Sequence, residues 1–101
     1  MEKVLTKRIS EKKLFTCTEM LRAVAHPARM AIIDLLGIRG PLSVTEIFTA
    51  LEMEQAAVSH QLGILRKNNL LEFRKEGKKM IYRLTRPELI QIIRCIEKCA
   101  L

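Results

Sequence analysis

The spacing of the apolar residues changes once along this chain, near Leu70, and that change limits the folds open to it. Before Leu70 the apolar residues recur at steps of three and four, as on one face of an α-helix, for example at Val58, Leu62 and Leu65. After Leu70 they alternate with charged residues, as in strands with one buried face, and Gly77 marks a turn between the halves. The pattern therefore predicts a mainly helical chain with a β-hairpin towards its C-terminal end.

Short breaks divide the helical part of the chain. Gly40-Pro41 end the second helix, and Ser43-Val44-Thr45-Glu46 have the pattern of a capping box that begins the third. Only Glu52-Met53-Glu54 separate the third helix from the fourth, which is the spacing of a helix-turn-helix. Pro87 opens a last helix after the hairpin. This order predicts a winged helix-turn-helix of the α+β class, with five helices and a two-stranded wing, as one domain over residues 1–101.

Positive charge is concentrated in and around the predicted hairpin. The chain has a net charge of +7, and residues 66–86 supply eight lysines and arginines against two glutamates. Residues 1–13 add a net charge of +3, and up to about residue 10 we expect a loose arm or an extra helical turn. So local an excess is typical of a polyanion-binding surface, although a solvated basic face without a partner is the simpler alternative. Because only 4% of the residues are aromatic, stacking on single-stranded bases is disfavoured, and we expect double-stranded DNA as the partner.

The composition also argues against several classes of protein. No apolar run approaches the length of a membrane span, and the N-terminal residues lack the apolar core of a secretory signal, so we expect a cytoplasmic protein. Three cysteines in a chain without a signal indicate reduced thiols rather than a disulfide framework. The chain has two histidines, no glycine-rich phosphate loop and no clustered nucleophile and base, so we expect no enzymatic activity.

Four stretches, taken in order, resemble one known family across roughly residues 15 to 95. They are residues 21–32 (LRAVAHPARMAI), 51–62 (LEMEQAAVSHQL), 65–71 (LRKNNLL) and 76–84 (EGKKMIYRL). The family is the ArsR/SmtB family of bacterial metal-sensing repressors. The resemblance implies a homodimer held by the first and last helices, which binds a two-fold-symmetric DNA operator and represses transcription. Two positions depart from the family pattern: Glu52 stands in a turn where the family often has glycine, and Gly63 where it often has a basic residue.

The candidate base-reading surface is the outward face of the fourth helix, because the N-terminal part of the second helix of a helix-turn-helix enters the major groove. Glutamine can pair with adenine, serine can meet several base edges, and an alanine methyl can contact thymine. For a histidine there, a phosphate contact or simple exposure is an equally good interpretation. The candidates on this face are Gln55, Ala56, Ser59, His60 and Gln61. The candidate phosphate contacts are Ser43 and Thr45 at the start of the third helix, Lys67, and the wing cations Arg74, Lys75, Lys78 and Lys79.

The resemblance also bears on what the protein senses. The best-known metal site of the family uses two cysteines at the start of the third helix, and here Ser43 and Thr45 replace both, so that site is absent. A second family site uses Asp and His on the last helix, which has neither here, so we expect no zinc, cobalt or nickel site there.

The three cysteines remain as candidates. Cys95 and Cys99 are four residues apart in the last predicted helix and share one face of it, and Cys17 lies on the apolar stripe of the first. Small buried hydrophobes are one interpretation of these cysteines. A second is a soft-ion site for arsenite, antimonite or cadmium as inducer, since three thiolates suit thiophilic ions. A disulfide or persulfide bridge from Cys17 to Cys95 or Cys99 is its rival, and an unrelated small-molecule pocket is the remaining possibility.

Taken together, these features predict a homodimeric, DNA-binding transcriptional repressor that needs no cofactor and is released by a thiol-reactive or soft-metal inducer. A redox- or persulfide-sensing repressor is one alternative. The other is a winged-helix protein-interaction module that dimerises but has lost its operator, against which the charge of the wing and the polar face of the fourth helix both argue.

Overall fold

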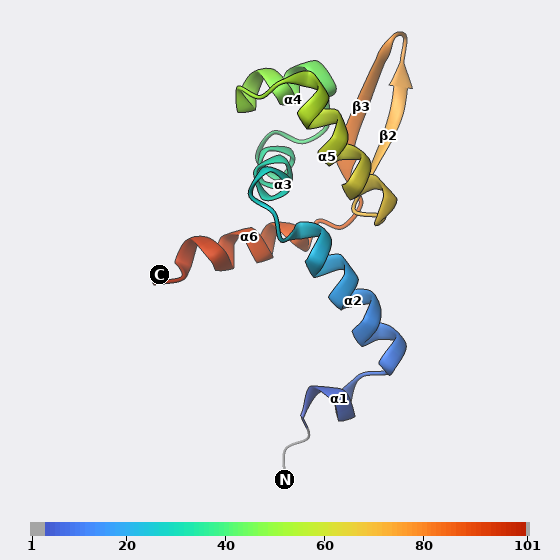
Figure 1. Cartoon of the computed structure of the whole chain (residues 1–101), viewed down its shortest axis with the longest axis vertical. Coiled ribbons are helices and arrows are strands. Elements are labelled where there is room, and N and C mark those ends of the chain that lie inside the picture. The colour runs from blue at the N-terminus through green and yellow to red at the C-terminus, as the bar shows by residue number, and fades with distance from the viewer. Residues whose placement is uncertain (1–3, 101) are drawn as a thin grey trace.

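Residues 4–100, the part of the chain that the computed structural model describes, form six helices and a small antiparallel sheet (Figure 1). The sheet has the strand order β1-β3-β2. The architecture is the predicted winged helix-turn-helix, mainly helical and of the α+β class. Its elements are α1 (Leu5–Arg8), α2 (Glu11–Val24), α3 (Pro27–Arg39), β1 (Leu42–Ser43), α4 (Val44–Leu51), α5 (Gln55–Lys67), β2 (Leu71–Glu76), β3 (Lys79–Leu84) and α6 (Leu89–Lys98).

Two counts in the prediction need correction. The sixth helix is the single turn α1. It is the extra helical turn that the sequence allowed, beside a loose arm, for the residues up to about 10. The wing is joined by a third strand, β1, in which Leu42 pairs with Tyr82 and Ser43 with Ile81. Two residues are too few to display an alternating pattern, which is why sequence reasoning missed this strand.

The core lies between α3, α5 and the start of the wing. The predicted stripe of α5 is confirmed, since Val58, Leu62 and Leu65 are fully buried. They pack in one cluster with Ile32 and Ile33 of α3. At the next interface α6 lies so close to α3 that a Cβ atom on Gly37 would be 2.9 Å from the side chain of Ile90. These contacts place α4, α5 and the wing around one small core.

The terminal helices leave this core in different directions (Figure 1). Of the fourteen residues of α2, only Ala23 and Val24 are buried. Large apolar side chains on these helices remain in contact with solvent, among them Phe15 at 68%, Leu21 at 49% and Ile96 at 44% exposure. Along the apolar stripe predicted for α2, Val24 is therefore buried, Cys17 is half-buried and Leu21 is exposed in a single chain. No helix within residues 4–100 is long and apolar enough to cross a membrane.

The junction of α2 and α3 is a tight turn at His26. The His26 imidazole Nδ1 accepts a hydrogen bond from the backbone N–H of Ala28 at 3.1 Å, so His26 caps α3. Pro27 takes the first position of α3, as predicted. The C-terminal end of α2, with its free carbonyl groups, therefore lies directly beside the start of α3.

The helix-turn-helix consists of α4, the three residues 52–54 and α5. Glu52 adopts the left-handed conformation (φ 53°, ψ 44°), which glycine, the residue the family often has there, reaches without steric cost. At the second departure from the family pattern, α5 runs through Gly63 without interruption, and the space around that residue is open. Neither departure changes the fold.

Replacing Glu52 by glycine should raise the free energy of unfolding by up to about 1 kcal/mol. Glycine adopts the left-handed conformation without steric cost, and this gain exceeds its larger loss of chain entropy on folding. Urea unfolding at neutral pH measures the effect. Glu52→Ala is the matched control, because it removes the same carboxylate but keeps a Cβ atom at the left-handed position, and it should not stabilise. A Glu52→Gly protein less stable than wild type would contradict the strain.

Candidate nucleic-acid interface

One face of α5 is polar and open to solvent. Gln55, Ala56, Ser59 and His60 are all exposed in the first half of the helix. The N-terminus of α5 has no side-chain cap, so its first backbone N–H groups are free of side-chain partners. Four of the five predicted base-facing residues therefore lie together on an accessible surface.

Gln61, the fifth, turns the other way. It is half-buried, and its Oε1 accepts a hydrogen bond from Nη1 of Arg29 in α3 at 2.9 Å. This bond holds the side-chain amide of Gln61 towards α3, so its contact with DNA stays a prediction that the geometry does not support. Gln61 follows Val58 by three residues and precedes Leu65 by four, which puts it at the edge of the buried stripe.

Ser43 also needs correction as a phosphate contact. Its side chain is only 4% exposed, and its hydroxyl accepts a hydrogen bond from the backbone N–H of Glu46 at 3.1 Å. In return, the backbone N–H of Ser43 donates to the Glu46 carboxylate at 3.0 Å, which completes the predicted capping box. Pairing of β1 with β3 covers Ser43. Thr45 remains exposed in the first turn of α4.

The capping box is electrostatically tuned. The backbone and hydroxyl of Ser43 hydrogen-bond the Glu46 carboxylate and lower its pKa below the ordinary 4.5, with smaller contributions from Lys79 and Arg39. The backbone N–H of Ser43 is thus already bonded to a carboxylate of the chain itself and is not available to a phosphate.

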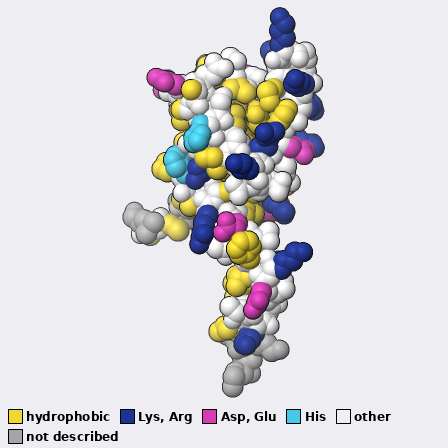
Figure 2. All heavy atoms as spheres, turned by 45° about the vertical axis from the view of Figure 1, so that its right-hand side comes forward, with side chains coloured by type: hydrophobic (Ala, Val, Ile, Leu, Met, Phe, Trp, Pro, Cys, Tyr) yellow, Lys and Arg dark blue, Asp and Glu magenta, His cyan; other side chains and the backbone are white. Residues whose placement is uncertain are grey.

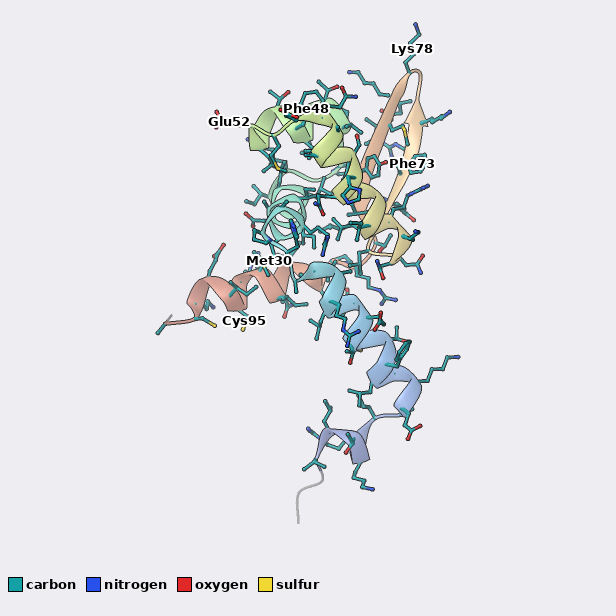
Figure 3. All side chains as sticks on the ribbon, in the orientation of Figure 1. Met30, Phe48, Glu52, Phe73, Lys78 and Cys95 are labelled. Atoms are coloured by element: carbon teal, nitrogen blue, oxygen red, sulfur yellow. The ribbon has the colours of Figure 1, made fainter. Side chains whose placement is uncertain are left out.

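The wing carries exposed cations on a firmly paired hairpin. Glu76 pairs with Lys79, so Gly77 and Lys78 form the tip, and Gly77 has the positive φ (62°) that favours glycine. Lys78 projects from that tip (Figure 3). Figure 2 shows lysine and arginine side chains over the wing. Arg74 is paired with Glu76 at 3.0 Å, whereas within residues 4–100 no ion pair involves Lys75, Lys78 or Lys79.

The base of the wing is tied to the end of α5. The guanidinium of Arg66 lies 5.0 Å from the ring centre of Phe73, which in turn packs against Tyr82 with ring centres 5.5 Å apart. Sequence reasoning did not single out Arg66, and no spacing rule links it to Phe73. Lys67, the next residue, lies about 18 Å along the helix axis from Gln55 and lines a groove beside α2. Lys67 therefore lies at the opposite end of α5 from Gln55.

The cysteines do not meet within one chain. Cys17 is half-buried on α2, whereas Cys95 is exposed on α6 (Figure 3). Cys99 lies one residue beyond the end of α6 at Lys98, and its backbone is extended. The prediction that Cys95 and Cys99 share one face of the helix therefore fails, because Cys99 is not part of it. Cys95 and Cys99 still line one shallow pocket, together with Gln91, Arg94 and Lys98. In the described part of the chain no three His, Cys, Asp or Glu side chains are placed to hold a metal ion.

The fold and this surface define a winged helix-turn-helix of the DNA-binding class. Residues 26–72 match the family model described as "Bacterial regulatory protein, arsR family". The biofilm growth-associated repressor of Agrobacterium fabrum is 33% identical over 86 residues, which are 85% of this chain and 73% of that protein. The structure of HlyU from Vibrio cholerae has 31% identity and a TM-score of 0.78, covering 88% of this chain and 96% of HlyU. The homodimeric winged helix-turn-helix DNA-binding domain Mb0332 from Mycobacterium bovis has 28% identity and a TM-score of 0.74, covering 88% and 84%.

The chain belongs to the ArsR family of bacterial regulatory proteins. It is a DNA-binding transcriptional regulator and not an enzyme.

The capping box predicts a pH dependence of stability. Because the folded-state pKa of Glu46 is lowered, its carboxylate stabilises the fold fully above the ordinary value of 4.5, and this contribution is lost as the pH falls through the folded-state pKa. Glu46→Gln keeps a side-chain oxygen that can accept the hydrogen bond from the Ser43 backbone N–H but removes the negative charge. It should be less stable than wild type at pH 7, by a margin that shrinks in acid, as urea midpoints at several pH values would show. Glu97→Gln, at an exposed glutamate of α6, is the control, and an equal margin for Glu46→Gln at every pH would contradict the assignment.

Proposed function

We propose that this chain is a cytoplasmic, homodimeric repressor that binds a two-fold-symmetric operator in double-stranded DNA. The observation that carries the proposal is the exposed face formed by Gln55, Ala56, Ser59 and His60 on α5, next to the basic wing. A polar helix surface beside a cationic hairpin can read base edges and grip the adjoining phosphates at the same time.

The terminal helices support the homodimer. An exposed apolar surface of this kind on a small domain is stabilised by association, and a two-fold dimer buries the same surface on both copies. Phe15, Leu21 and Ile96 are the large exposed apolar residues of α2 and α6. A structural relative, Mb0332, is described as homodimeric. On this basis residues 1–101 form one DNA-binding domain with a dimerisation helix at each end.

Within this assembly the two surfaces have different roles. Gln55 can make two hydrogen bonds to an adenine edge, Ser59 and His60 can donate to base edges, and the Ala56 methyl can contact thymine. Thr45 and the wing cations, which are Arg74, Lys75, Lys78 and Lys79, contact phosphates, which carry no sequence information. Sequence choice therefore comes from α5, and much of the affinity from the wing.

Selection from a randomised duplex library tests the proposal. Two recognition helices related by a two-fold axis read two half-sites about one helical turn apart, so the enriched duplexes should contain an imperfect inverted repeat. Enrichment of a single asymmetric half-site would contradict the dimer model. Absence of any gel shift on random duplex DNA at low salt and micromolar protein would favour the alternative, a winged-helix module that binds another protein.

Variants of the two surfaces complete the same experiment. On the selected duplex Gln55→Ala should cost about 1–3 kcal/mol, with little loss on a scrambled duplex. The double variant Lys78→Ala, Lys79→Ala should weaken both duplexes alike. It should reduce the slope of log affinity against log salt by about two units per protomer, which is about four units for the homodimer. Equal losses on both duplexes for Gln55→Ala would refute this division of roles.

We further propose that the thiols respond to an inducer. The exposed pair Cys95 and Cys99 lies on one proposed dimerisation helix and Cys17 on the other. Since the three sulfurs do not gather within one chain, the site would join Cys17 of one protomer to the C-terminal pair of its partner. As three As–S bonds would form, three thiols would give their protons to the three hydroxyl groups of arsenite, which would leave as three waters. Antimonite or cadmium would use the same soft ligands. The redox or persulfide-sensing alternative needs an oxidant that takes two electrons as two thiols join.

A mixed dimer tests the inter-subunit arrangement. One protomer carries Cys17→Ser and the other Cys95→Ser with Cys99→Ser. Such a dimer keeps one intact three-thiol site if the site joins the two subunits, and none if each chain builds its own. Cadmium titration followed by thiolate absorbance should therefore find half the wild-type stoichiometry, with operator release still detectable. If the triple Cys→Ser homodimer responds to arsenite, antimonite, cadmium and a persulfide donor as wild type does, the cysteines sense nothing.

A further inference from the structure

One arginine connects three helices of this fold. Nη1 of Arg29, in the first turns of α3, donates to Oε1 of Gln61 on α5 at 2.9 Å. Nε of the same guanidinium donates to the backbone carbonyl of Ala23, in the last turn of α2. Arg29 is half-buried, and Ala23 is 5% exposed. The side chain therefore bridges the end of α2 and the middle of α5, two elements that lie 38 residues apart at these contacts.

The chemistry of the guanidinium makes this bridge directional. Its five N–H donors lie in one plane at fixed angles, so two bonds made at once define both the distance and the orientation of the partners. The carbonyl of Ala23 is among the last four of α2, which lack partners inside the helix, and a cation is favourable at this negative end. Lysine could supply the charge there but not the planar geometry.

The bridge meets α5 next to its DNA-facing residues. Gln61 directly follows Ser59 and His60, whose side chains lie on the exposed face. The apolar stripe of α5 holds the helix against the core, but hydrophobic contact is non-directional and restrains rotation about the helix axis less strictly than a hydrogen bond does. Even a small rotation of α5, too small to bring the stripe out of the core, would displace Ser59 and His60 relative to the bases.

We propose that Arg29 is a positioning residue for sequence discrimination: it sets the rotation of α5 against the end of α2, and so aims the base-reading face. The inference rests on the proposed function, in which α5 reads bases and α2 holds the dimer together. Because each protomer carries the bridge, Arg29 also relates each recognition helix to the dimerisation helix that determines the spacing of the two half-sites. Arg29 itself touches no base.

The experiment measures a ratio, namely the affinity for the duplex that wild type selects from a randomised library divided by the affinity for a scrambled duplex. Arg29→Ala and Arg29→Lys should each lower this ratio at least about tenfold, since misplaced side chains lose base contacts but not phosphate contacts. Affinity for the scrambled duplex should stay near wild type, which a merely unfolded variant could not achieve. Arg22→Ala is the matched control, because Arg22 stands at the same end of α2 but pairs only with Glu19 of its own helix, at 3.3 Å.

Variants of the partner separate positioning from direct reading. Gln61→Ala should lower the ratio as Arg29→Ala does, and the double variant should be no worse than either single one, because both remove the same link. Gln61→Glu keeps an acceptor for Arg29 and should retain the wild-type ratio. Additive losses, or a changed base preference at one position in Gln61→Glu alone, would overturn the inference. So would a wild-type ratio in both Arg29 variants. A wild-type protein that shows no discrimination at all would instead refute the proposed function.

Discussion

The one-sided burial of α5 is the constraint on which the rest of this structure depends. Val58, Leu62 and Leu65 are fully buried against the α3 side of the core. Because these residues recur at helical spacing, the opposite face of α5 must point to solvent. The exposed residues of its first half include Gln55, Ser59 and His60, the side chains proposed to meet base edges. The same core holds the start of the wing. Leu70, just before β2, and Leu71, its first residue, are buried in the same cluster as the α5 stripe.

A core this small does not cover the whole chain. The terminal helices contribute few buried residues, and those of α6 are Leu89 and Ile93. A chain of 101 residues has too little interior to bury every apolar side chain, so the remaining apolar surface is available for association. Association would serve the DNA-binding role as well, since a two-fold dimer brings two copies of the α5 face to one side of a duplex.

Charge and shape are divided between separate elements. The wing offers lysines that pair with no carboxylate within residues 4–100, and a lysine is a flexible point charge that suits phosphate of any sequence. The helix-turn-helix uses its carboxylates for structure instead, as Glu46 does in capping α4. Arg29 is the one cation in the described residues that bonds both to the end of α2 and to α5, and it lies inside the domain rather than on the DNA face.

The sequence alone determined the elements whose signals are local. The α5 stripe, the capping box at Ser43 and Glu46 and the glycine turn of the wing all follow from spacing or from backbone preferences within a few residues. Contacts between distant segments were decided only in the tertiary structure. Pairing of β1 with β3 buries Ser43, Arg29 turns Gln61 inward, and the divergence of α2 and α6 keeps Cys17 apart from Cys95. Each of these depends on where segments more than thirty residues apart meet, and such meetings follow from the packing of the whole core rather than from the period of any one helix or strand.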